Sequence, residues 1–373
     1  MQAPSVWRPH EDPEVIFEQL RFGDVVVHHP YESFATVEAF VRAAVRDPHV
    51  VAIKMTLYRI GANSPLIDLL LQAAENGKQI AVVLELQARF DERTNITWAR
   101  RLESHGVHVI YGFTHLKTHA KLCLVVRRDA DGIRGYVHIG TGNYNADTAK
   151  VYTDIGLFTA DRDLVDDAGA VFNYLTGYSA QKDFKALLVA PFQLRARLTQ
   201  LIETEAANAA AGTPARIVLK VNSLTDDQVI RALYRASQAG VTIDLIVRGA
   251  CCLRPGVPGV SDRIRVRSII GRFLEHSRIY WFLNGGADQM FIGSADLMER
   301  NLDRRVEVLT PVRDRAILAH VRDVVLQACL EDTDRARMLT RDGGYVRVER
   351  RSSTPSAQDA LIAHYEAADT DRR

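Results

Sequence analysis

The chain has few of the features that mark membrane, secreted or nucleic-acid-binding proteins. Cysteine occurs only four times in 373 residues, and no pair has the CxxC spacing of a zinc site. No apolar run is long enough to span a bilayer, and the first nine residues lack the apolar core of a signal peptide. The formal net charge is only +1, so no global field attracts nucleic acid. We therefore expect a cytoplasmic protein with reduced cysteines, no integral membrane segment and no nucleic-acid partner.

What the chain does contain is a histidine motif in each half. In the first half, residues 118–121 read THAK, and the turn GTGN follows at 140–143. In the second half, residues 275–278 read EHSR, and GSAD follows at 293–296. Positions i and i+2 of a strand face the same side, so each copy is expected to project its histidine and its cation together. Two imidazoles, two cations and two turns rich in small residues suit covalent chemistry on phosphorus.

The repeat extends beyond the histidines. Thirty residues separate Arg89 from His119, and 28 separate Arg248 from His276. Apolar periodicity predicts strands and helices in the same order in both halves. This alternation predicts an α/β fold of two tandem domains, each a mixed sheet flanked by helices and related by internal duplication. The strands are predicted over 51–59, 79–86, 107–111, 120–127, 216–221, 241–247, 264–270 and 278–282, and the helices over 66–76, 94–104, 193–210 and 226–239.

A polar, turn-prone stretch over 177–182 separates the two halves. We place the first domain at 1–183 and the second at 184–345. The remaining residues, 346–373, are charged and weakly patterned, and we expect them to form a partly ordered extension.

His119 is the predicted nucleophile. A neutral imidazole nitrogen can attack phosphorus and form a phosphoramidate that later transfers its phosphoryl group. His276, in the second copy, is predicted to act as a general acid or base on the leaving oxygen. Neutralising the phosphoryl oxygens of the transition state requires cations, and four are candidates: Lys121, Arg59, Arg89 and Arg248. The three arginines stand where strands are predicted to end, which is where α/β folds bind ligands, although one such arginine alone is as often surface solvation.

Three further patterns leave two interpretations open. The turn at 140–143 is either an ordinary hairpin turn or part of the site, and its counterpart at 293–296 favours the second. Tyr152 is either a stacking or hydroxyl contact or a core aromatic. His28 and His29 look like a metal-ligand pair, but neighbours on a strand point to opposite faces, which favours packing or capping.

The duplicated motif resembles that of the phospholipase D superfamily, in which two such motifs meet across a pseudo-two-fold axis. The superfamily pattern is His-x-Lys, four residues, then Asp. Here Val126 and Leu283 occupy the aspartate positions, and Arg278 replaces the second lysine. The resemblance implies phospholipase-D-like domains, and the departures argue against plain phosphodiesterase activity.

A longer resemblance, to polyphosphate kinases of the first type, covers almost the whole chain. It is carried by residues 28–34, 53–59, 85–92, 116–121, 138–145 and 274–276. It implies a reversible transfer of the ATP γ-phosphate to inorganic polyphosphate through a phosphohistidine at His119, with Mg²⁺ as cofactor. Members of the family are longer and have two further domains before this segment, so the chain corresponds to the catalytic half.

The same resemblance suggests roles for individual residues. Arg59 and Arg89 match positions associated with magnesium, and because a guanidinium cannot ligate a cation we interpret them as holding the phosphates that carry the metal. Tyr152, Arg248 and His276 match nucleotide-contacting positions. We expect Asn143 and Arg278 to join them at the phosphates.

The implied partners are ATP or ADP and inorganic polyphosphate. A homo-oligomer is expected, and peripheral membrane association stays open. Two alternatives to a kinase stand beside it. A phospholipase-D-like phosphodiesterase would need no ATP, and a non-catalytic truncated homologue would bind polyphosphate without turnover. The missing aspartates argue against the first alternative. For the second, the intact histidines argue against it and the absent domains argue for it.

Overall fold

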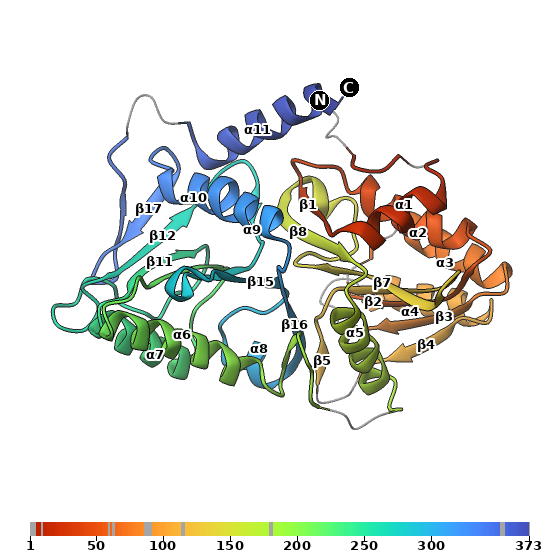
Figure 1. Ribbon diagram of the computed structural model, residues 1–373, viewed down its shortest axis with the longest axis horizontal. Helices are drawn as coiled ribbons and strands as arrows, with labels where there is room; N and C mark the ends of the chain where they lie inside the picture. The colour runs from red at the N-terminus through yellow and green to blue at the C-terminus, as the bar shows by residue number, and fades with distance from the viewer. Residues whose placement is uncertain are drawn as a thin grey trace.

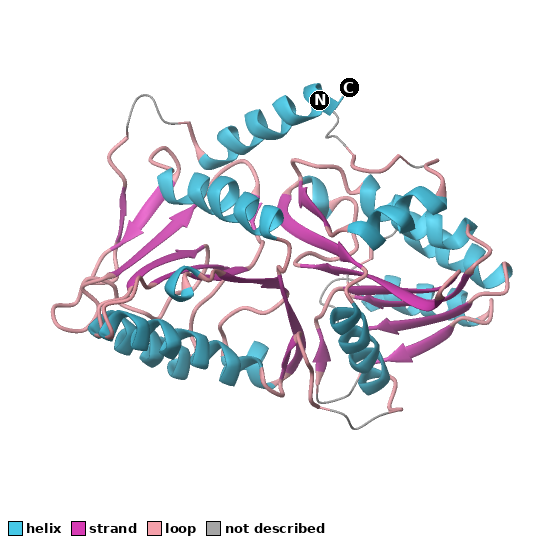
Figure 2. Cartoon of the chain, in the orientation of Figure 1, coloured by secondary structure: helices cyan, strands magenta, loops and turns pink. Residues whose placement is uncertain are grey.

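The computed structural model describes residues 5–8, 10–58, 60–61, 64–85, 92–112, 116–178, 182–350 and 355–372. Two lobes lie side by side, and each contains a mixed β-sheet with helices packed on it (Figure 1, Figure 2). The predicted α/β class and the tandem arrangement of two sheets are confirmed.

The first lobe is built from the first half of the chain. Its strands are β1 (Val25–His29), β2 (Val50–Leu57), β3 (Gln79–Leu84), β4 (His108–Tyr111), β6 (Leu122–Asp129), β7 (Gly132–Gly140) and β8 (Tyr152–Thr159). Its helices are α1 (Pro13–Phe22), α2 (Ala35–Arg46), α3 (Pro65–Glu75), α4 (Glu92–Glu103) and α5 (Arg162–Leu175), with a short 3₁₀ turn, η1 (Thr148–Lys150). The strand order is β1-β8-β7-β6-β2-β3-β4. Helices α1 to α4 pack on one face of this sheet and α5 packs on the other.

The second lobe follows the same plan. Its strands are β9 (Leu188–Ala190), β10 (Arg216–Val221), β11 (Thr242–Val247), β12 (Ile264–Ile269), β14 (Ile279–Phe282), β15 (Gln289–Gly293), β16 (Arg305–Pro311), β17 (Ala336–Leu339) and β18 (Tyr345–Arg347). Its helices are α6 (Leu194–Ala210), α7 (Asp227–Gln238), α8 (Glu299–Asp303), α9 (Arg315–His320), α10 (Gln327–Glu331) and α11 (Ala357–Arg372), with a 3₁₀ turn, η2 (Asn284–Gly286), and a π-helical turn, η3 (Val321–Leu326). Helices α6 and α7 pack on one face, and η3, α10 and α11 pack on the other.

The two sheets confirm the internal duplication strand by strand. The order β9-β16-β15-β14-β10-β11-β12 in the second lobe repeats the order β1-β8-β7-β6-β2-β3-β4 in the first. The directions also agree, because β10, β11 and β12 are parallel, as β2, β3 and β4 are, and the other pairs of both series are antiparallel.

The lobes exchange two very short strands. Strand β5 (Lys117–Thr118), from the first half, pairs in parallel with β16 of the second lobe. Strand β13 (Leu274–Glu275), from the second half, pairs in parallel with β8 of the first lobe. Each exchanged strand directly precedes a motif histidine, so each histidine is delivered to the sheet of the opposite lobe.

Local sequence signals explain why the predicted helices form. Helix α7 begins where the Asp226 side chain accepts a hydrogen bond from the backbone N–H of Val229, as an N-cap does. It is followed by Gly240, whose φ of 106° a side chain would disfavour. Its buried residues recur at helical spacing and face the core of the lobe: Val229, Ile230, Ala232, Leu233 and Ala236.

The predicted helices over 66–76, 193–210 and 226–239 match α3, α6 and α7 to within one residue at each end. The prediction that the two His-x-cation motifs lie on strands is wrong. Strand β6 begins at Leu122 and β14 at Ile279, so both His-x-cation motifs lie on the connections just before these strands. The reason is that the chain must turn there from one lobe's sheet to the other's.

The C-terminal segment holds a helix that the sequence analysis did not predict. Helix α11 packs Ala357, Leu361 and Tyr365 into a buried cluster that also contains Tyr31 and Ile155 of the first lobe. In Figure 1 it lies across the top of the molecule, from the second lobe toward the first. Strand β18 also precedes it, so 346–373 is an integrated part of the fold where it is described.

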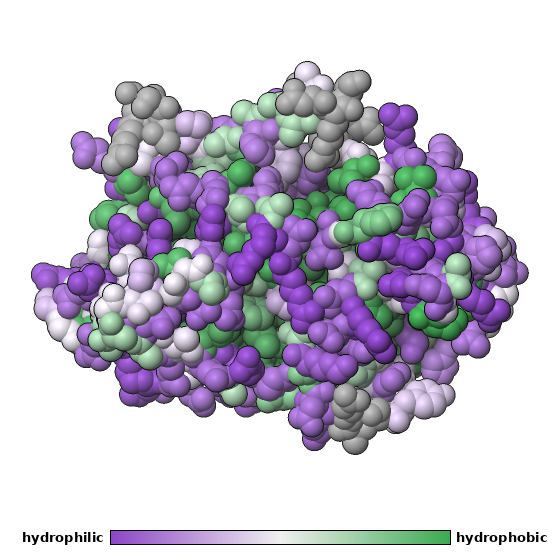
Figure 3. Space-filling model, in the orientation of Figure 1, coloured by the Kyte–Doolittle hydropathy of each residue, from purple (hydrophilic) through white to green (hydrophobic). Residues whose placement is uncertain are grey.

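The molecular face in Figure 3 is largely hydrophilic with scattered apolar groups. Within the described residues, no helix combines the length and the apolar composition that a bilayer crossing needs.

A buried ion network centred on Arg127 connects α1 with the end of strand β6. Arg127 of β6 donates to Asp47 at 2.8 Å and to Asp129 at 2.6 Å, and it also pairs with Glu14 of α1. Arg127, Asp47 and Asp129 are all at most 5% exposed. Removing the arginine would leave two carboxylates buried without their main cation.

We therefore expect Arg127→Ala to lower the free energy of unfolding by about 3–5 kcal/mol, the usual result of breaking a buried ion pair on one side. Denaturant unfolding followed by circular dichroism measures this. The matched control is Arg231→Ala, which removes an exposed pair with Asp227 inside α7 and should leave the denaturant midpoint almost unchanged. Equal effects of the two variants would contradict the prediction.

Candidate active site

His119 is fixed beside strand β16 by its own backbone. Its N–H donates to the carbonyl of Val306 at 2.9 Å, which continues the pairing of β5 with β16. Its side chain reaches the next residue of that strand, and Nδ1 lies 2.8 Å from Oε2 of Glu307. Glu307 is fully buried and His119 is 9% exposed. A carboxylate on Nδ1 favours the tautomer with a proton there, so the other ring nitrogen, Nε2, carries the lone pair.

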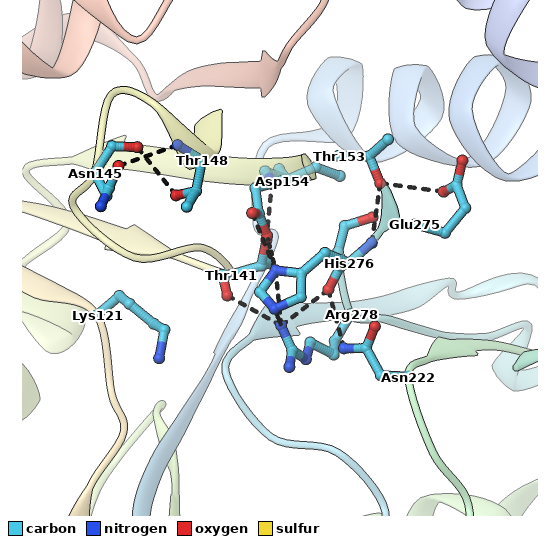
Figure 4. A network of polar contacts seen from close by, with 12 residues as sticks. Lys121, Thr141, Asn145, Thr148, Thr153, Asp154, Asn222, Glu275, His276 and Arg278 are labelled. Atoms are coloured by element: carbon cyan, nitrogen blue, oxygen red, sulfur yellow. Dashed lines mark hydrogen bonds and ion pairs between the residues drawn. The ribbon is translucent and has the colours of Figure 1, made fainter. Parts of the chain in front are cut away.

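His276 is held in the same way against strand β8. Its N–H donates to Oγ1 of Thr153 at 3.1 Å, and its Nδ1 lies 2.8 and 3.0 Å from the two carboxylate oxygens of Asp154 (Figure 4). The site therefore consists of two imidazole–carboxylate pairs. In each pair the histidine comes from one half of the chain and the carboxylate from the other.

The two turns rich in small residues orient these carboxylates. Thr141 donates to Asp154 at 2.6 Å and accepts from the N–H of Ile155. Ser294, the counterpart of Thr141, accepts from the N–H of Val308 and bonds Glu307. A Cβ on Gly142 would lie 2.3 Å from an oxygen of Asp154, which explains the glycine there. The turn at 140–143 therefore lies at the site, as its counterpart at 293–296 suggested.

The second-half cation, Arg278, is buried beside His276. It donates to the carbonyls of His276 and Thr141 at 2.9 and 3.2 Å, and to Asp296 at 3.1 Å. Its Nη1 also lies 3.2 Å from Nε2 of His276. Its contacts with Thr141 and Asp296 reach the turns of the first and second halves, so Arg278 connects both repeats.

Lys121, the first-half cation, is 2% exposed. Its Nζ donates to the carbonyl of His119 and lies 5.6 Å from the centre of the Tyr58 ring. Tyr58 in turn meets the His119 ring edge-on at 5.4 Å. Figure 4 shows Lys121 on the first-lobe side of the same space that holds His276 and Arg278.

Tyr152 and Arg248 lie around His276. The Tyr152 ring is 5.1 Å from the imidazole. Arg248 donates to the carbonyl of Glu275 at 2.6 Å and to Oδ1 of Asn222, whose amide donates to the carbonyl of His276 at 3.2 Å. Both side chains thus flank the connection that carries the second histidine.

The other residues singled out in the sequence lie in different places. Asn143 lines a small cavity beside Asp154, and its Oδ1 is buried with no hydrogen-bond partner among the described residues. Arg59 and Arg89 lie outside the described residues. His28 and His29 bond different groups, Tyr365 at 3.3 Å and the carbonyl of Glu32 at 2.9 Å, which matches the packing and capping interpretation.

The electrostatics of the two pairs differ. Burial, together with the charges of Lys121 and Arg305, lowers the pKa of His119 well below its usual value, so the imidazole is neutral at pH 7. Burial raises the pKa of Glu307 to about 7 and lowers that of Lys121 to about 7. Asp154 is different, because His276 and Thr141 outweigh its burial and lower its pKa to about 2.

For His276, burial lowers the pKa, and the neighbouring Asp154 acts in the opposite direction. An ionised carboxylate at 2.8 Å can stabilise an imidazolium when a proton arrives. The geometry is thus repeated, whereas the charge states are not.

Sequence reasoning missed the two carboxylates and Arg305, which precedes Glu307 by two residues and lies 3.8 Å from it. The repeat held a usable signal. Asp154 follows the first glycine of its turn, Gly140, by 14 residues. Glu307 follows Gly293 by the same 14 residues.

Comparison with known proteins now identifies the family. Residues 15–181 match the family described as polyphosphate kinase C-terminal domain 1, and residues 187–358 match polyphosphate kinase C-terminal domain 2. The chain belongs to the polyphosphate kinase family. A polyphosphate kinase of Thermosynechococcus vestitus is 59% identical over 331 residues, which are 88% of this chain and 45% of that protein. The chain spans about half the length of the curated relatives it matches.

Solved structures agree with this assignment. The crystal structure of polyphosphate kinase from Porphyromonas gingivalis superposes with a TM-score of 0.89 and 37% identity, over 99% of this chain and 55% of that one. The phosphatidylserine synthase of Haemophilus influenzae has a TM-score of 0.59 at 11% identity, over 97% of this chain and 98% of that one. This second likeness shows the shared fold alone.

The hydrogen-bond arrangement predicts one tautomer for His119. In ¹⁵N-histidine-labelled protein we expect a neutral ring protonated on Nδ1 at pH 8, where Glu307 is ionised, and because the pKa of His119 is lowered the ring should still be neutral below pH 6.5. The His119→Gln spectrum assigns the signal. In Glu307→Leu the preference for Nδ1–H should be lost. A doubly protonated ring at pH 7 in the unsubstituted protein would contradict the arrangement.

Proposed function

We propose that this chain transfers the γ-phosphoryl group of ATP reversibly to inorganic polyphosphate through a phosphohistidine at His119. The observation that carries the proposal is the buried His119 ring bonded at Nδ1 to Glu307, with a second imidazole–carboxylate pair, His276 and Asp154, built in the same way. Burial lowers the pKa of His119, which favours a neutral nucleophile. Membership of the polyphosphate kinase family supports the choice of substrates.

In the first step, Nε2 of His119 attacks the γ-phosphorus of ATP. A P–N bond forms, the bond between that phosphorus and the β,γ-bridging oxygen breaks, and ADP leaves. The Nδ1 proton stays on the hydrogen bond to Glu307, which stabilises the positive charge that the ring acquires. In the second step, a terminal oxygen of polyphosphate attacks the phosphohistidine, the P–N bond breaks and the chain is one phosphate longer.

His276 is proposed to act at the leaving and entering oxygens. With Asp154 ionised beside it, its ring can donate a proton to departing ADP, or take one from an incoming phosphate in the reverse sense. Three cations are proposed to bind the phosphates: Lys121 next to His119, and Arg278 and Arg248 next to His276. Tyr152, whose ring lies beside His276, is proposed to contact the nucleotide. Asn143, Arg59 and Arg89 keep their proposed phosphate-binding roles from the sequence.

Mg²⁺ fits this site only as a partner of the nucleotide. Asp154, Glu307 and Asp296 are each engaged by a histidine or an arginine, and the described residues include no cluster of three or more acidic, histidine or cysteine side chains suited to a metal. Magnesium commonly binds substrate phosphates with few protein ligands. When bound there it would neutralise phosphate charge, and Arg59 and Arg89 are proposed to hold the same phosphates.

The remaining parts of the proposal rest on the family. ATP or ADP and inorganic polyphosphate are the proposed partners, the proposed location is the cytoplasm, and the proposed assembly is a homo-oligomer. None of these depends on the geometry of the two histidine pairs.

A pulse of γ-labelled ATP with Mg²⁺ tests the covalent step. We expect unsubstituted protein to acquire label that is stable to alkali and labile to acid, as a phosphohistidine is, and His119→Ala to acquire none. His105→Ala, which replaces an exposed histidine on the connection after α4, is the matched control and should label normally. Label on His119→Ala, or no label on unsubstituted protein, would overturn the proposal.

The two carboxylates give a second test. In Glu307→Gln and Asp154→Asn the side-chain size is kept, but the amide no longer favours Nδ1–H and no longer stabilises an imidazolium. We expect kcat to fall by roughly 10²–10⁴, as in other sites where a carboxylate orients a catalytic histidine. Loss of Asp154 also removes the charge that raises the pKa of His276, so the alkaline limb of the kcat profile should move to lower pH. Unchanged kcat in both variants would contradict the assigned roles.

A further inference from the structure

A glutamine of the C-terminal helix bonds the segment that carries His276. Helix α11 begins at Ala357, far along the chain, and its second residue is Gln358. Gln358 is 3% exposed. Its carboxamide accepts from the N–H of Phe273 at 2.9 Å and donates to the carbonyl of the same residue at 2.9 Å. The amide thus pairs with the segment before β13 as a neighbouring strand would.

The same amide nitrogen makes a third contact. It donates at 2.7 Å to Oε1 of Glu275, the residue immediately before His276. The other oxygen of Glu275 accepts from Thr153 at 3.1 Å and pairs with Lys220 at 2.8 Å. Thr153 is also the acceptor for the His276 N–H, and Figure 4 shows these bonds from Glu275 through Thr153 to His276. A short bonded path therefore runs from Gln358 through Glu275 and Thr153 to the backbone of the histidine.

The surroundings show that Gln358 is held firmly in this place. The N–H of Ala357 donates to the buried carboxylate of Asp332 at 2.8 Å, which fixes the start of α11. A Cβ on Gly271 would lie 2.4 Å from the Gln358 oxygen, so the chain opposite is glycine where the helix approaches most closely. Farther along, Tyr365 stacks on Tyr31 at 5.7 Å and anchors the helix to the first lobe.

We propose that Gln358 is a positioning residue for His276: it holds the Phe273–Glu275 segment in register and thereby keeps the imidazole against Asp154. The inference rests on the proposed kinase activity. Gln358 touches no reacting atom in this scheme, so it acts only through the placement of His276. Strand β13 has two residues, and its pairing with β8 alone gives the histidine little restraint.

The position of the His276 ring determines its pKa, because charged groups surround it. His276 is surrounded by charged and titratable groups from several elements: Asp154 and Tyr152 of β8, Arg278 of its own connection, Asp296 after β15, Arg248 after β11, and the Glu275–Lys220 pair. Of these, Asp154 makes the closest contact. If the ring moves away from Asp154, it loses the partner that helps it carry a proton, and the acid form is lost at a lower pH.

The test compares three variants of the whole chain in steady-state polyphosphate synthesis. Gln358→Leu removes all three hydrogen bonds. Gln358→Glu keeps the shape but places a second carboxylate against Glu275. We expect both to lower kcat by about ten- to a hundredfold with KM for ATP within about twofold. In Gln358→Leu, which adds no charge, the alkaline limb of the kcat profile should also move to lower pH. The control, Tyr365→Phe, removes the hydroxyl bonds from α11 to His320 and to His28 while keeping the ring, and should retain the unsubstituted kcat and profile.

Each outcome decides the matter. If kcat and its pH profile are unchanged in Gln358→Leu, the residue has no positioning role. If Tyr365→Phe loses as much activity as Gln358→Leu, the effect belongs to the helix as a whole, and the positioning role is again overturned. If Gln358→Leu shows no cooperative thermal transition, Gln358→Glu decides in its place. If the unsubstituted chain makes no polyphosphate, the proposed function fails separately. The ¹⁵N signals of the His276 ring then test positioning, since Gln358→Leu should change them and Tyr365→Phe should not.

Discussion

The structure depends on the reciprocal exchange of two short strands between its lobes. Because β5 pairs with β16 and β13 pairs with β8, each motif histidine enters the sheet that carries its carboxylate. Neither of the two imidazole–carboxylate pairs lies within one half of the chain. A fully buried Glu307 without its partner would be costly, so docking of the lobes and assembly of the site stabilise each other. The site is therefore a property of the interface and not of either repeat.

Duplication provides the frame, and burial and neighbouring charges make its two sides unequal. Glu307 is completely enclosed and its pKa rises to about 7, whereas Asp154 keeps a strongly ionised carboxylate with a pKa of about 2 beside His276 and Thr141. Groups of one kind whose environments move their pKa values apart commonly divide acid, base and nucleophile roles between them. This inequality supports the proposal that His119 is the nucleophile and that His276, beside an ionised carboxylate, takes up and releases the proton.

The regular part of this fold could be predicted from the sequence, because helices such as α7 and the buried strands obey apolar periodicity over many residues. The exchange of β5 and β13 could not, because a two-residue strand has no period to detect. Asp154 and Glu307 were not predicted because each lies far along the chain from its histidine. Their only sequence signal is that Asp154 follows Gly140, and Glu307 follows Gly293, by the same number of residues. Helix α11 was missed because its only large apolar residues are Leu361, Ile362 and Tyr365, and alanines and polar residues fill the rest of the helix.

Short exchanged strands create a mechanical problem that side chains must solve. A strand of two residues offers only a few backbone hydrogen bonds, each contributing about 0.5–1.5 kcal/mol net, which is little restraint for a ring that must be placed within a fraction of an ångström. In the first half, the Thr118 N–H of β5 donates to Glu85 at 3.0 Å, a carboxylate from the end of the first lobe's own β3. In the second half, Gln358 and Lys220 bond Glu275 of β13. Both histidines are thus preceded by a segment held from two sides, once by the opposite sheet and once by a buried polar side chain. The second half recruits that side chain from the C-terminal helix, so α11 belongs to the support of the site as well as to the core.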